Sequence, residues 1–297
     1  MNQQIVLARW AWGASKSIST DAKLRTKFTL AALRNPEAAS ALARPDALLA
    51  RQLADDPQTV GNLVWPYQCA TWDAAERVTR IRAHFEVVQK VPGLQLTIDQ
   101  KLMLADLSEL SEGLSLIIDR PLWLAREGHL ALSLFKGRFR AFTVSFSLND
   151  TSLREIFIGG IQGRSAEGIL DIYRDLTKSL HGVRPRDFLL DGLRMFGELI
   201  GVQRILAVSD SSRISRHSYF KGKVSDSDYD VVWTDRGGTL EADTHYSLPT
   251  AIVRRTADET PAKKRQMYRK RYEMFDKIAD SLPRDLRTAN IVRFEAG

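Results

Sequence analysis

The stretch of residues 157–210 limits the fold more than any other part of this sequence. Its pattern predicts a strand that ends in Gly-Gly-Ile-Gln-Gly (residues 159–163), two amphipathic helices, and a second strand at residues 204–208. A strand end without side chains, followed by the start of a helix, can present unpaired backbone N–H groups to an anion. We therefore expect the functional site at the end of the first of these strands.

The composition is that of a globular protein with a moderate excess of positive charge. The chain has 297 residues, 44% of them hydrophobic, with 43 Lys and Arg against 36 Asp and Glu. Its single cysteine, Cys69, excludes an internal disulfide and favours a reducing compartment. No basic leader opens the sequence, and no apolar run approaches the roughly 18 residues of a membrane span. We therefore expect a cytoplasmic protein whose contact with the inner membrane, where it occurs, is peripheral.

The first part of the chain is predicted to be helical. Thr20 or Asp21 can cap one helix, residues 36–53 form another, and Asp73 followed by Glu76 resembles a capping box. We expect a helical N-terminal region at residues 1–64 and an α+β domain at residues 65–297.

The β-rich part begins near Gly113. Four runs, at residues 114–118, 129–135, 139–148 and 153–161, are separated by breaks of which the shorter two suit hairpins, and this favours an antiparallel meander. Ser165 and Pro185 can begin the two helices that follow. Further strands are predicted at residues 229–234 and 244–248. The predicted fold is α+β, with a mixed, mostly antiparallel sheet flanked by helices.

Six residues near the glycine-rich strand end form the candidate cofactor site. Three follow the strand and three occupy the turn between the two helices: Gln162, Gly163, Arg164, His181, Gly182 and Arg184. Glycine lets a backbone approach a phosphate closely, and the pair His181 and Arg184 can neutralise a phosphate or a carboxylate. A bulge or close packing would equally explain the glycines, and a helix cap with a surface ion pair would explain the turn.

The candidate catalytic residues are His217 and Tyr219, which follow the strand at residues 204–208 in a polar segment. From this position a general acid can reach a cleft at the strand end. A solvated loop would have the same composition.

The candidate substrate-binding residues are Tyr229, Asp230, Trp233 and Arg265. We expect Asp230 to pair with a basic residue such as Arg265 or Lys264. Tyr229 and Trp233 alternate with apolar neighbours, so a place in the core is the alternative.

Metal and common nucleotide sites are not expected. The histidines, at positions 84, 129, 181, 217 and 245, show no i, i+4 pair and no Glu at ligand spacing. The sequence also lacks a Gly-x-Ser-x-Gly elbow, a Walker phosphate loop and a dinucleotide fingerprint, which excludes the commoner hydrolases, kinases and Rossmann enzymes.

A basic segment at residues 263–272 opens the last predicted helix. It holds six basic residues and no acid. The helix repeats Tyr268, Tyr272, Phe275, Ala279 and Leu282 at helical spacing, which predicts one buried stripe and one positive face. The positive face favours weak peripheral contact with anionic membranes, with a solvated surface as the alternative. No specific nucleic-acid partner is expected, because this face lacks aromatic residues.

Several segments in a fixed order make the chain similar to the VirK/YbjX family of Gram-negative bacterial proteins. They are Ile-Gly-Gly-Ile-Gln-Gly at 158–163, Thr-Lys-Ser-Leu-His-Gly-Val-Arg-Pro at 177–185, Tyr-Asp-Val-Val-Trp at 229–233 with Gly237-Gly238, Leu248-Pro249, and Lys264-Arg265 with Tyr268, Arg271 and Tyr272. The resemblance implies a virulence or cell-envelope factor linked to outer-membrane maintenance and antimicrobial peptide resistance. His84-Phe85 departs from the family's His-Tyr, so a role for a tyrosine hydroxyl there is not expected.

The order of the predicted elements also resembles a GNAT-type acyltransferase. In that fold, backbone amides between a strand and the following helix hold the pyrophosphate of an acyl-CoA, and residues 162–164 and 181–184 are the counterparts here. The resemblance implies acyl-CoA as the cofactor and an acyl donor or other small molecule as the partner, although the Gln/Arg-x-x-Gly-x-Gly/Ala signature is absent. The competing expectation is a noncatalytic protein that binds acidic lipid or a protein partner. The oligomeric state is left open.

Overall fold

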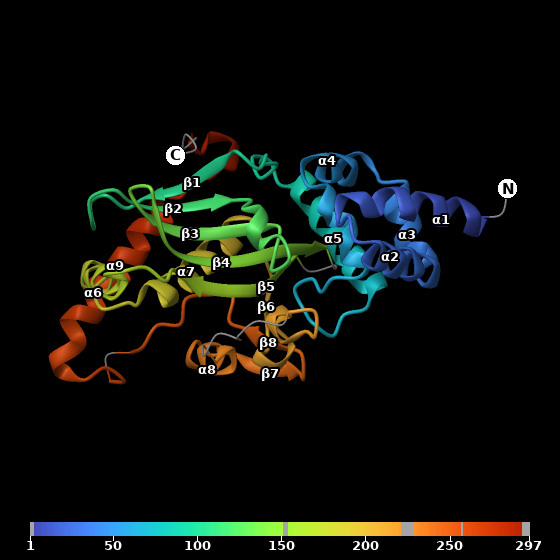
Figure 1. Cartoon of the computed structure of the whole chain (residues 1–297). Helices are drawn as coiled ribbons and strands as arrows, with labels where there is room; N and C mark the ends of the chain where they lie inside the picture. The colour runs from blue at the N-terminus through green and yellow to red at the C-terminus, as the bar shows by residue number, and fades with distance from the viewer. Residues whose placement is uncertain (1–2, 151–153, 221–227, 257, 293–297) are drawn as a thin grey trace.

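The computed structural model describes residues 3–150, 154–220, 228–256 and 258–292, which form a nine-stranded sheet with helices around it (Figure 1). The strand order is β7-β8-β6-β5-β4-β3-β2-β1-β9. The strands are β1 (Lys101–Asp106), β2 (Leu114–Asp119), β3 (Leu130–Lys136), β4 (Phe139–Asp150), β5 (Arg154–Gly163), β6 (Arg204–Val208), β7 (Thr239–Ala242), β8 (His245–Leu248) and β9 (Ile291–Val292). This arrangement confirms the predicted α+β class and the mixed, mostly antiparallel sheet.

Strands β2 to β5 form the antiparallel meander that the sequence predicts, and β1, which it does not predict, adds one more antiparallel strand at its edge. Strand β5 then pairs in parallel with β6, because the connection between them is a crossover that carries α6 (Ile169–Ser179) and α7 (Pro185–Leu199). Among the described strands this is the single parallel pair. Leu153, the predicted first residue of β5, lies outside the described residues.

The N-terminal helices lie beside the sheet, on the side away from α6 and α9 in Figure 1. They are α1 (Gln3–Ala14), α2 (Ala22–Arg34), α3 (Pro36–Ala43), α4 (Ala47–Asp55) and α5 (Ala74–Lys90). The predicted cap at Asp73 is confirmed, because its side chain accepts a hydrogen bond from the Glu76 N–H (2.8 Å). The predicted helix at 36–53 is two helices, since Pro45 separates them and Asp46 caps the second.

The apolar core lies between the sheet and α7. The rings of Phe146 on β4 and Phe196 on α7 are 5.8 Å apart, and Phe188 stacks at 5.9 Å on Phe275 of α9 (Arg265–Ser281). A second cluster of buried residues runs from Leu7 to Phe85 and joins the N-terminal helices to α5. The division of the chain at residue 64 stays a prediction.

Three local predictions are corrected. Residues 229–234 lie in a helix, α8 (Tyr229–Asp235), because the Asp228 side chain accepts hydrogen bonds from two N–H groups of its first turn. The helix expected from Ser165 begins only at Ile169, after Gly168 with φ 71°. On α9 the buried residues are Met274, Phe275 and Ile278, whereas Ala279 is exposed and Tyr268 and Tyr272 are half-buried.

Candidate functional site

The glycine pair in β5 makes room for Glu127, in the loop before β3. The β4–β5 ladder shifts register between Ser145 and Phe146, which leaves Gly159 as an extra residue on β5. A Cβ atom on Gly159 would lie 2.9 Å from the carbonyl carbon of Glu127, and one on Gly160 would lie 2.6 Å from the Glu127 Cδ. A bulge and close packing therefore explain both glycines.

The Glu127 side chain turns inward over β5. The Gln162 Nε2 donates a hydrogen bond to its Oε2 (3.1 Å). Burial raises the pKa of Glu127 to about 7, against smaller lowering effects of the Ser145 hydroxyl, Arg213 and the Gln162 amide. A carboxyl group that titrates near neutral pH can accept and release a proton, which is a property of many catalytic sites.

Strand β6 ends beside Glu127, at Val208. Its pairing with β5 ends at Ile158 and Ala207, while β5 runs on to Gly163. We call the place beside this last part of β5, where β6 no longer pairs with it, the gap. The Tyr229 hydroxyl fills the gap, where it accepts a hydrogen bond from the Ile161 N–H (3.0 Å) and donates one to the Ile161 carbonyl (3.1 Å).

The buried Arg213 completes this group. Its guanidinium carbon lies 4.9 Å from the centre of the Tyr229 ring, and its Nε is 3.4 Å from Asp210 Oδ1. Burial, and then the charge of Glu127, raise the pKa of Tyr229. We call Glu127, Gln162, Arg213 and Tyr229 the strand-end cluster.

A cavity of about 580 Å³ opens between α6, the start of α7 and β4. Its walls include Phe142, Leu170, Tyr173, Arg174, Arg184 and Arg186. We call it the α6–α7 pocket, and it combines aromatic and aliphatic walls with three guanidinium groups. Such a lining suits an amphiphilic anion.

Three predicted cofactor residues meet at the α6–α7 pocket. Arg184 lines it, the Arg164 N–H donates to the Tyr173 hydroxyl (2.8 Å), and a Cβ atom on Gly163 would lie 2.5 Å from that hydroxyl oxygen. Arg174 and Arg186 are paired with aspartates at 2.5 and 2.9 Å. The exposed Arg184 side chain has neither a hydrogen bond nor an ion pair with the described residues.

The other predicted cofactor residues point elsewhere. Gln162 is turned toward Glu127. The carbonyl of His181 accepts hydrogen bonds from Arg271 of α9 at 3.2 and 3.3 Å. A Cβ atom on Gly182 would meet the sulfur of Met267, also on α9, at 2.9 Å. The turn at 181–184 therefore faces α9 with its first half and the α6–α7 pocket with Arg184.

His217 and Tyr219 lie against the N-terminal part of the chain. The Tyr219 ring is 5.9 Å from that of Trp65, and the Arg126 guanidinium lies 4.2 Å from the Trp65 ring. Burial, followed by the charges of Arg77 and Lys27, lowers the pKa of His217. Neither residue lines the α6–α7 pocket, and their catalytic role stays a prediction.

The predicted substrate residues of α8 have other partners. The Trp233 indole is fully buried and donates to the Val208 carbonyl (2.8 Å). The Asp230 carboxylate accepts a hydrogen bond from the Asp210 N–H (2.8 Å), because α8 begins directly beside the end of β6. The expected ion pair of Asp230 with Lys264 or Arg265 is therefore wrong. The Arg265 Nε donates to the Thr260 carbonyl (3.3 Å).

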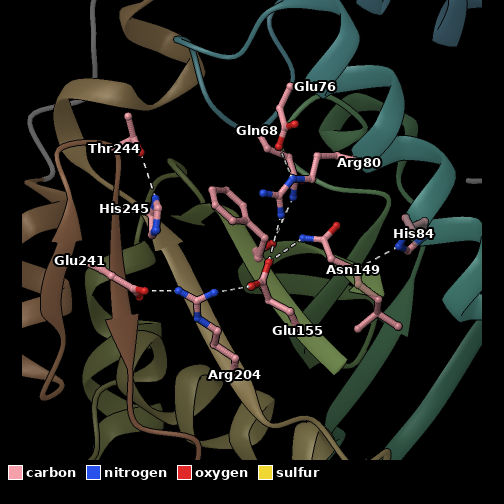
Figure 2. Close-up of polar contacts among 12 residues, drawn as sticks. Gln68, Glu76, Arg80, His84, Asn149, Glu155, Arg204, Glu241, Thr244 and His245 are labelled. Atoms are coloured by element: carbon pink, nitrogen blue, oxygen red, sulfur yellow. Dashed lines mark hydrogen bonds and ion pairs between the residues drawn. The ribbon is translucent and has the colours of Figure 1, made fainter. Parts of the chain in front are cut away.

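Figure 2 shows a second charged group, centred on Glu155 of β5. Its carboxylate is 3.1 Å from Arg80 Nη1 and 3.3 Å from Arg204 Nη1, and it accepts a hydrogen bond from Asn149 Nδ2 (2.9 Å). Arg204 also pairs with Glu241 of β7. These side chains come from α5, β4, β5, β6 and β7. We therefore infer that the network is structural and holds α5 against the sheet.

Sequence reasoning missed Glu127, Arg213 and Glu155. Each is a single charged residue outside any motif. The glycines opposite Glu127 were the one available signal: close packing was an open alternative to a ligand there, but nothing in the sequence named the side chain that packs against them.

The described residues offer neither a metal site nor a membrane span. They contain no group of three or more His, Cys, Asp or Glu side chains placed to hold a metal ion. No helix in the described ranges combines the length and apolar character needed to cross a membrane.

Comparison with known proteins gives consistent matches over most of the chain. A family model described as "Protein of unknown function (DUF535)" matches residues 17–284. The "Uncharacterized protein YbjX" of Escherichia coli K12 is 29% identical over 251 residues, which cover 78% of this chain and 72% of that protein. A Haemophilus influenzae protein is 29% identical over 217 residues, or 70% of each chain. No solved structure matches.

Proposed function

The chain belongs to the VirK/YbjX (DUF535) family, and we propose that it is a GNAT-like acyl-group transferase that uses an acyl-CoA or a similar acyl thioester. The observation that carries the proposal is the end of the β5–β6 pairing at Ile158 and Ala207, at the parallel pair of an otherwise antiparallel sheet. Ligands of open α/β sheets bind outside the carboxyl ends of parallel strands, where the connections change direction.

The α6–α7 pocket is the proposed site of the acyl donor. Its apolar walls suit an acyl or pantetheine chain. Arg184, which has no ion pair of its own with the described residues, stands at the N-terminus of α7 and suits a phosphate of the donor. This assignment keeps Gly163, Arg164 and Arg184 as cofactor-binding residues.

Glu127 is the proposed general base. An amine or hydroxyl of the acceptor attacks the thioester carbonyl and gives its proton to the Glu127 carboxylate. The C–S bond then breaks, and the leaving thiolate takes a proton from water; the hydroxide left behind is neutralised by the proton that Glu127 releases, which restores the carboxylate.

The geometry sets one condition on this reaction. Gly163 pairs with Phe142, which lines the pocket, whereas Gly160 pairs with Ser145 on the face that Glu127 covers. The reaction therefore needs an opening between the two faces, and we propose that it forms at Tyr229, whose hydroxyl is bonded to Ile161 between them. We expect its hydroxyl to leave Ile161 when the donor binds.

The binding step is tested by thermal unfolding with CoA, acetyl-CoA and a long-chain acyl-CoA. A ligand that binds only the folded state raises the melting temperature. We expect Arg184→Gln and Gly163→Val to abolish this rise, and Arg9→Gln, an exposed change on α1, to keep it. A rise that is equal in all variants, or absent in the parent protein, contradicts the donor site.

The chemical step is tested by release of free thiol from acyl-CoA in the presence of amine acceptors. We expect Glu127→Gln to reduce the rate at least tenfold while the rise in melting temperature persists. Unchanged thiol release in this variant would remove Glu127 from the mechanism.

A second candidate function is noncatalytic binding of acidic lipid. It rests on exposed basic side chains in and just before the first turns of α9, which include Lys263 and Lys264 in the short 3-10 helix before it and Lys270 in α9 itself. In this case the protein would act in the cytoplasm, at the surface of the inner membrane, as an envelope or virulence accessory factor. Either function is compatible with the expectation that the family supports the outer membrane and antimicrobial peptide resistance.

A further inference from the structure

A second cavity, of about 350 Å³, lies where α7, the turn after α8 and α9 meet. Its lining includes Asp191, Arg236, Arg255, Tyr268, Arg271 and Tyr272. We call it the arginine–tyrosine pocket. The turn at 181–184 lies between the two pockets: Val183 lines the arginine–tyrosine pocket, and Arg184 lines the α6–α7 pocket.

The arginines of this pocket retain donors that the described residues do not use. Arg236 pairs with Asp191 through Nη2, but its buried Nε has no acceptor. Arg271 gives Nε and Nη2 to the His181 carbonyl, and Nη1 remains. The exposed Arg255 guanidinium has no hydrogen bond to a described residue. Arg255 and Arg271 therefore keep N–H donors beside this cavity, which the guanidinium-bearing Arg236 also lines.

The acidic groups nearby leave an excess of positive charge. Asp191 is buried and already shared, because Arg194 donates to the same oxygen (2.7 Å) as Arg236. Asp235 lines the wall but is exposed. Glu259 lies near Arg255, and its carboxylate accepts hydrogen bonds from Thr256. An added anion would accept hydrogen bonds from the remaining N–H donors without displacing a buried ion pair.

The tyrosines hold these donors in place. The guanidinium carbons of Arg271 and Arg255 lie 4.3 and 5.7 Å from the Tyr268 ring, so one ring positions both arginines. The Tyr272 oxygen accepts a hydrogen bond from the Arg255 N–H (2.8 Å), which leaves its own proton to donate. Guanidinium and phenol donors around one space match the several acceptor oxygens of a phosphate group.

We propose that the arginine–tyrosine pocket binds a phosphomonoester or diphosphate group. This site is distinct from the proposed acyl-donor site. The phosphate can belong to a soluble metabolite or to a lipid headgroup, since both carry the same acceptor oxygens.

Isothermal titration calorimetry of the whole chain with inorganic phosphate and pyrophosphate tests the proposal. We expect pyrophosphate to bind, and Arg255→Gln and Arg271→Gln each to weaken it about tenfold or more. The matched control is Arg254→Gln, which removes the same charge one residue away, from an arginine that pairs with Asp276 and lies 5.3 Å from the Tyr272 ring but does not line the pocket. It should change the affinity less than about twofold.

Two further measurements identify the source of the phosphate group and distinguish this site from the α6–α7 pocket. Vesicles with phosphatidic acid should compete with pyrophosphate if the ligand is a lipid, and should not compete if it is soluble. Arg184→Gln should leave pyrophosphate binding unchanged. The proposal is wrong if neither phosphate binds, if Arg254→Gln weakens binding as much as Arg255→Gln, or if Arg184→Gln alone abolishes it.

Discussion

A methyl group on Gly160 would come within 2.6 Å of the Cδ of Glu127, so the loop before β3 packs directly onto β5. This contact places a carboxyl group beside the gap between β5 and β6. It also accounts for the two glycines at this point of the strand, so that no bound ligand is needed to explain them. The glycines at the end of β5 therefore accommodate Glu127, which comes from a loop distant in the sequence.

Gly159→Ala should destabilise the protein by about 1–3 kcal/mol, because its Cβ would meet the Glu127 backbone, which cannot rotate away. Gly13→Ala in α1 is the control, since nothing lies within 4 Å of the added carbon. It should be neutral or stabilising by up to about 1 kcal/mol. Urea unfolding measures both. Equal stability of the two variants would contradict the close packing.

The stability should depend on pH through Glu127. Its pKa rises from 4.5 to about 7 on folding, so the folded protein keeps a proton that the unfolded chain releases in this window. The free energy of unfolding should therefore fall as the pH rises from 4.5 to about 7, by on the order of 1–3 kcal/mol, and then level off.

Urea unfolding at several pH values compares the parent with Glu127→Gln, which should lose this dependence. Glu112→Gln, an exposed change in the loop before β2, should keep it. A Glu127→Gln curve parallel to that of the parent would show that Glu127 does not titrate as expected.

Glu155→Gln should cost about 1–3 kcal/mol, because it removes the buried carboxylate that Arg80 and Arg204 share, although each arginine keeps a second partner, Glu76 or Glu241. The control is Glu241→Gln, which removes the other partner of Arg204. The Glu241 side chain is 40% exposed against 2% for Glu155, so the expected cost is at most about 1 kcal/mol. Chemical denaturation of both variants tests whether the network in Figure 2 stabilises the contact between α5 and the sheet. A similar loss of unfolding free energy in the two variants would contradict that interpretation.

Replacing Lys263, Lys264 and Lys270 by Gln should abolish binding to anionic vesicles. Each exposed basic residue near an anionic leaflet contributes on the order of 1 kcal/mol, and salt screens the effect. Cosedimentation with and without anionic lipid, at low and high salt, measures this. Recovery that is independent of lipid charge, or unchanged in the triple variant, would rule out the membrane contact.

The helix caps at Asp21 and Asp73 and the meander could be predicted from the sequence, because they depend on neighbouring residues. Asp73 and Glu76 lie within one turn, and the hairpin breaks lie between consecutive strands. The segment Tyr-Asp-Val-Val-Trp at 229–233 was predicted as a strand, since a short apolar run has no decisive period. Asp228, one residue earlier, caps it as a helix.

The sequence by itself determined the α+β class, the order of the main elements and the family, as these follow from local periodicity and from segments in a fixed order. Only the tertiary structure decided what meets at the strand end. Gly160 and Glu127 are far apart in the chain, as are Ile161 and Tyr229, and no local pattern records such pairs. Burial, which raises the pKa of Glu127, likewise depends on packing from several elements at once.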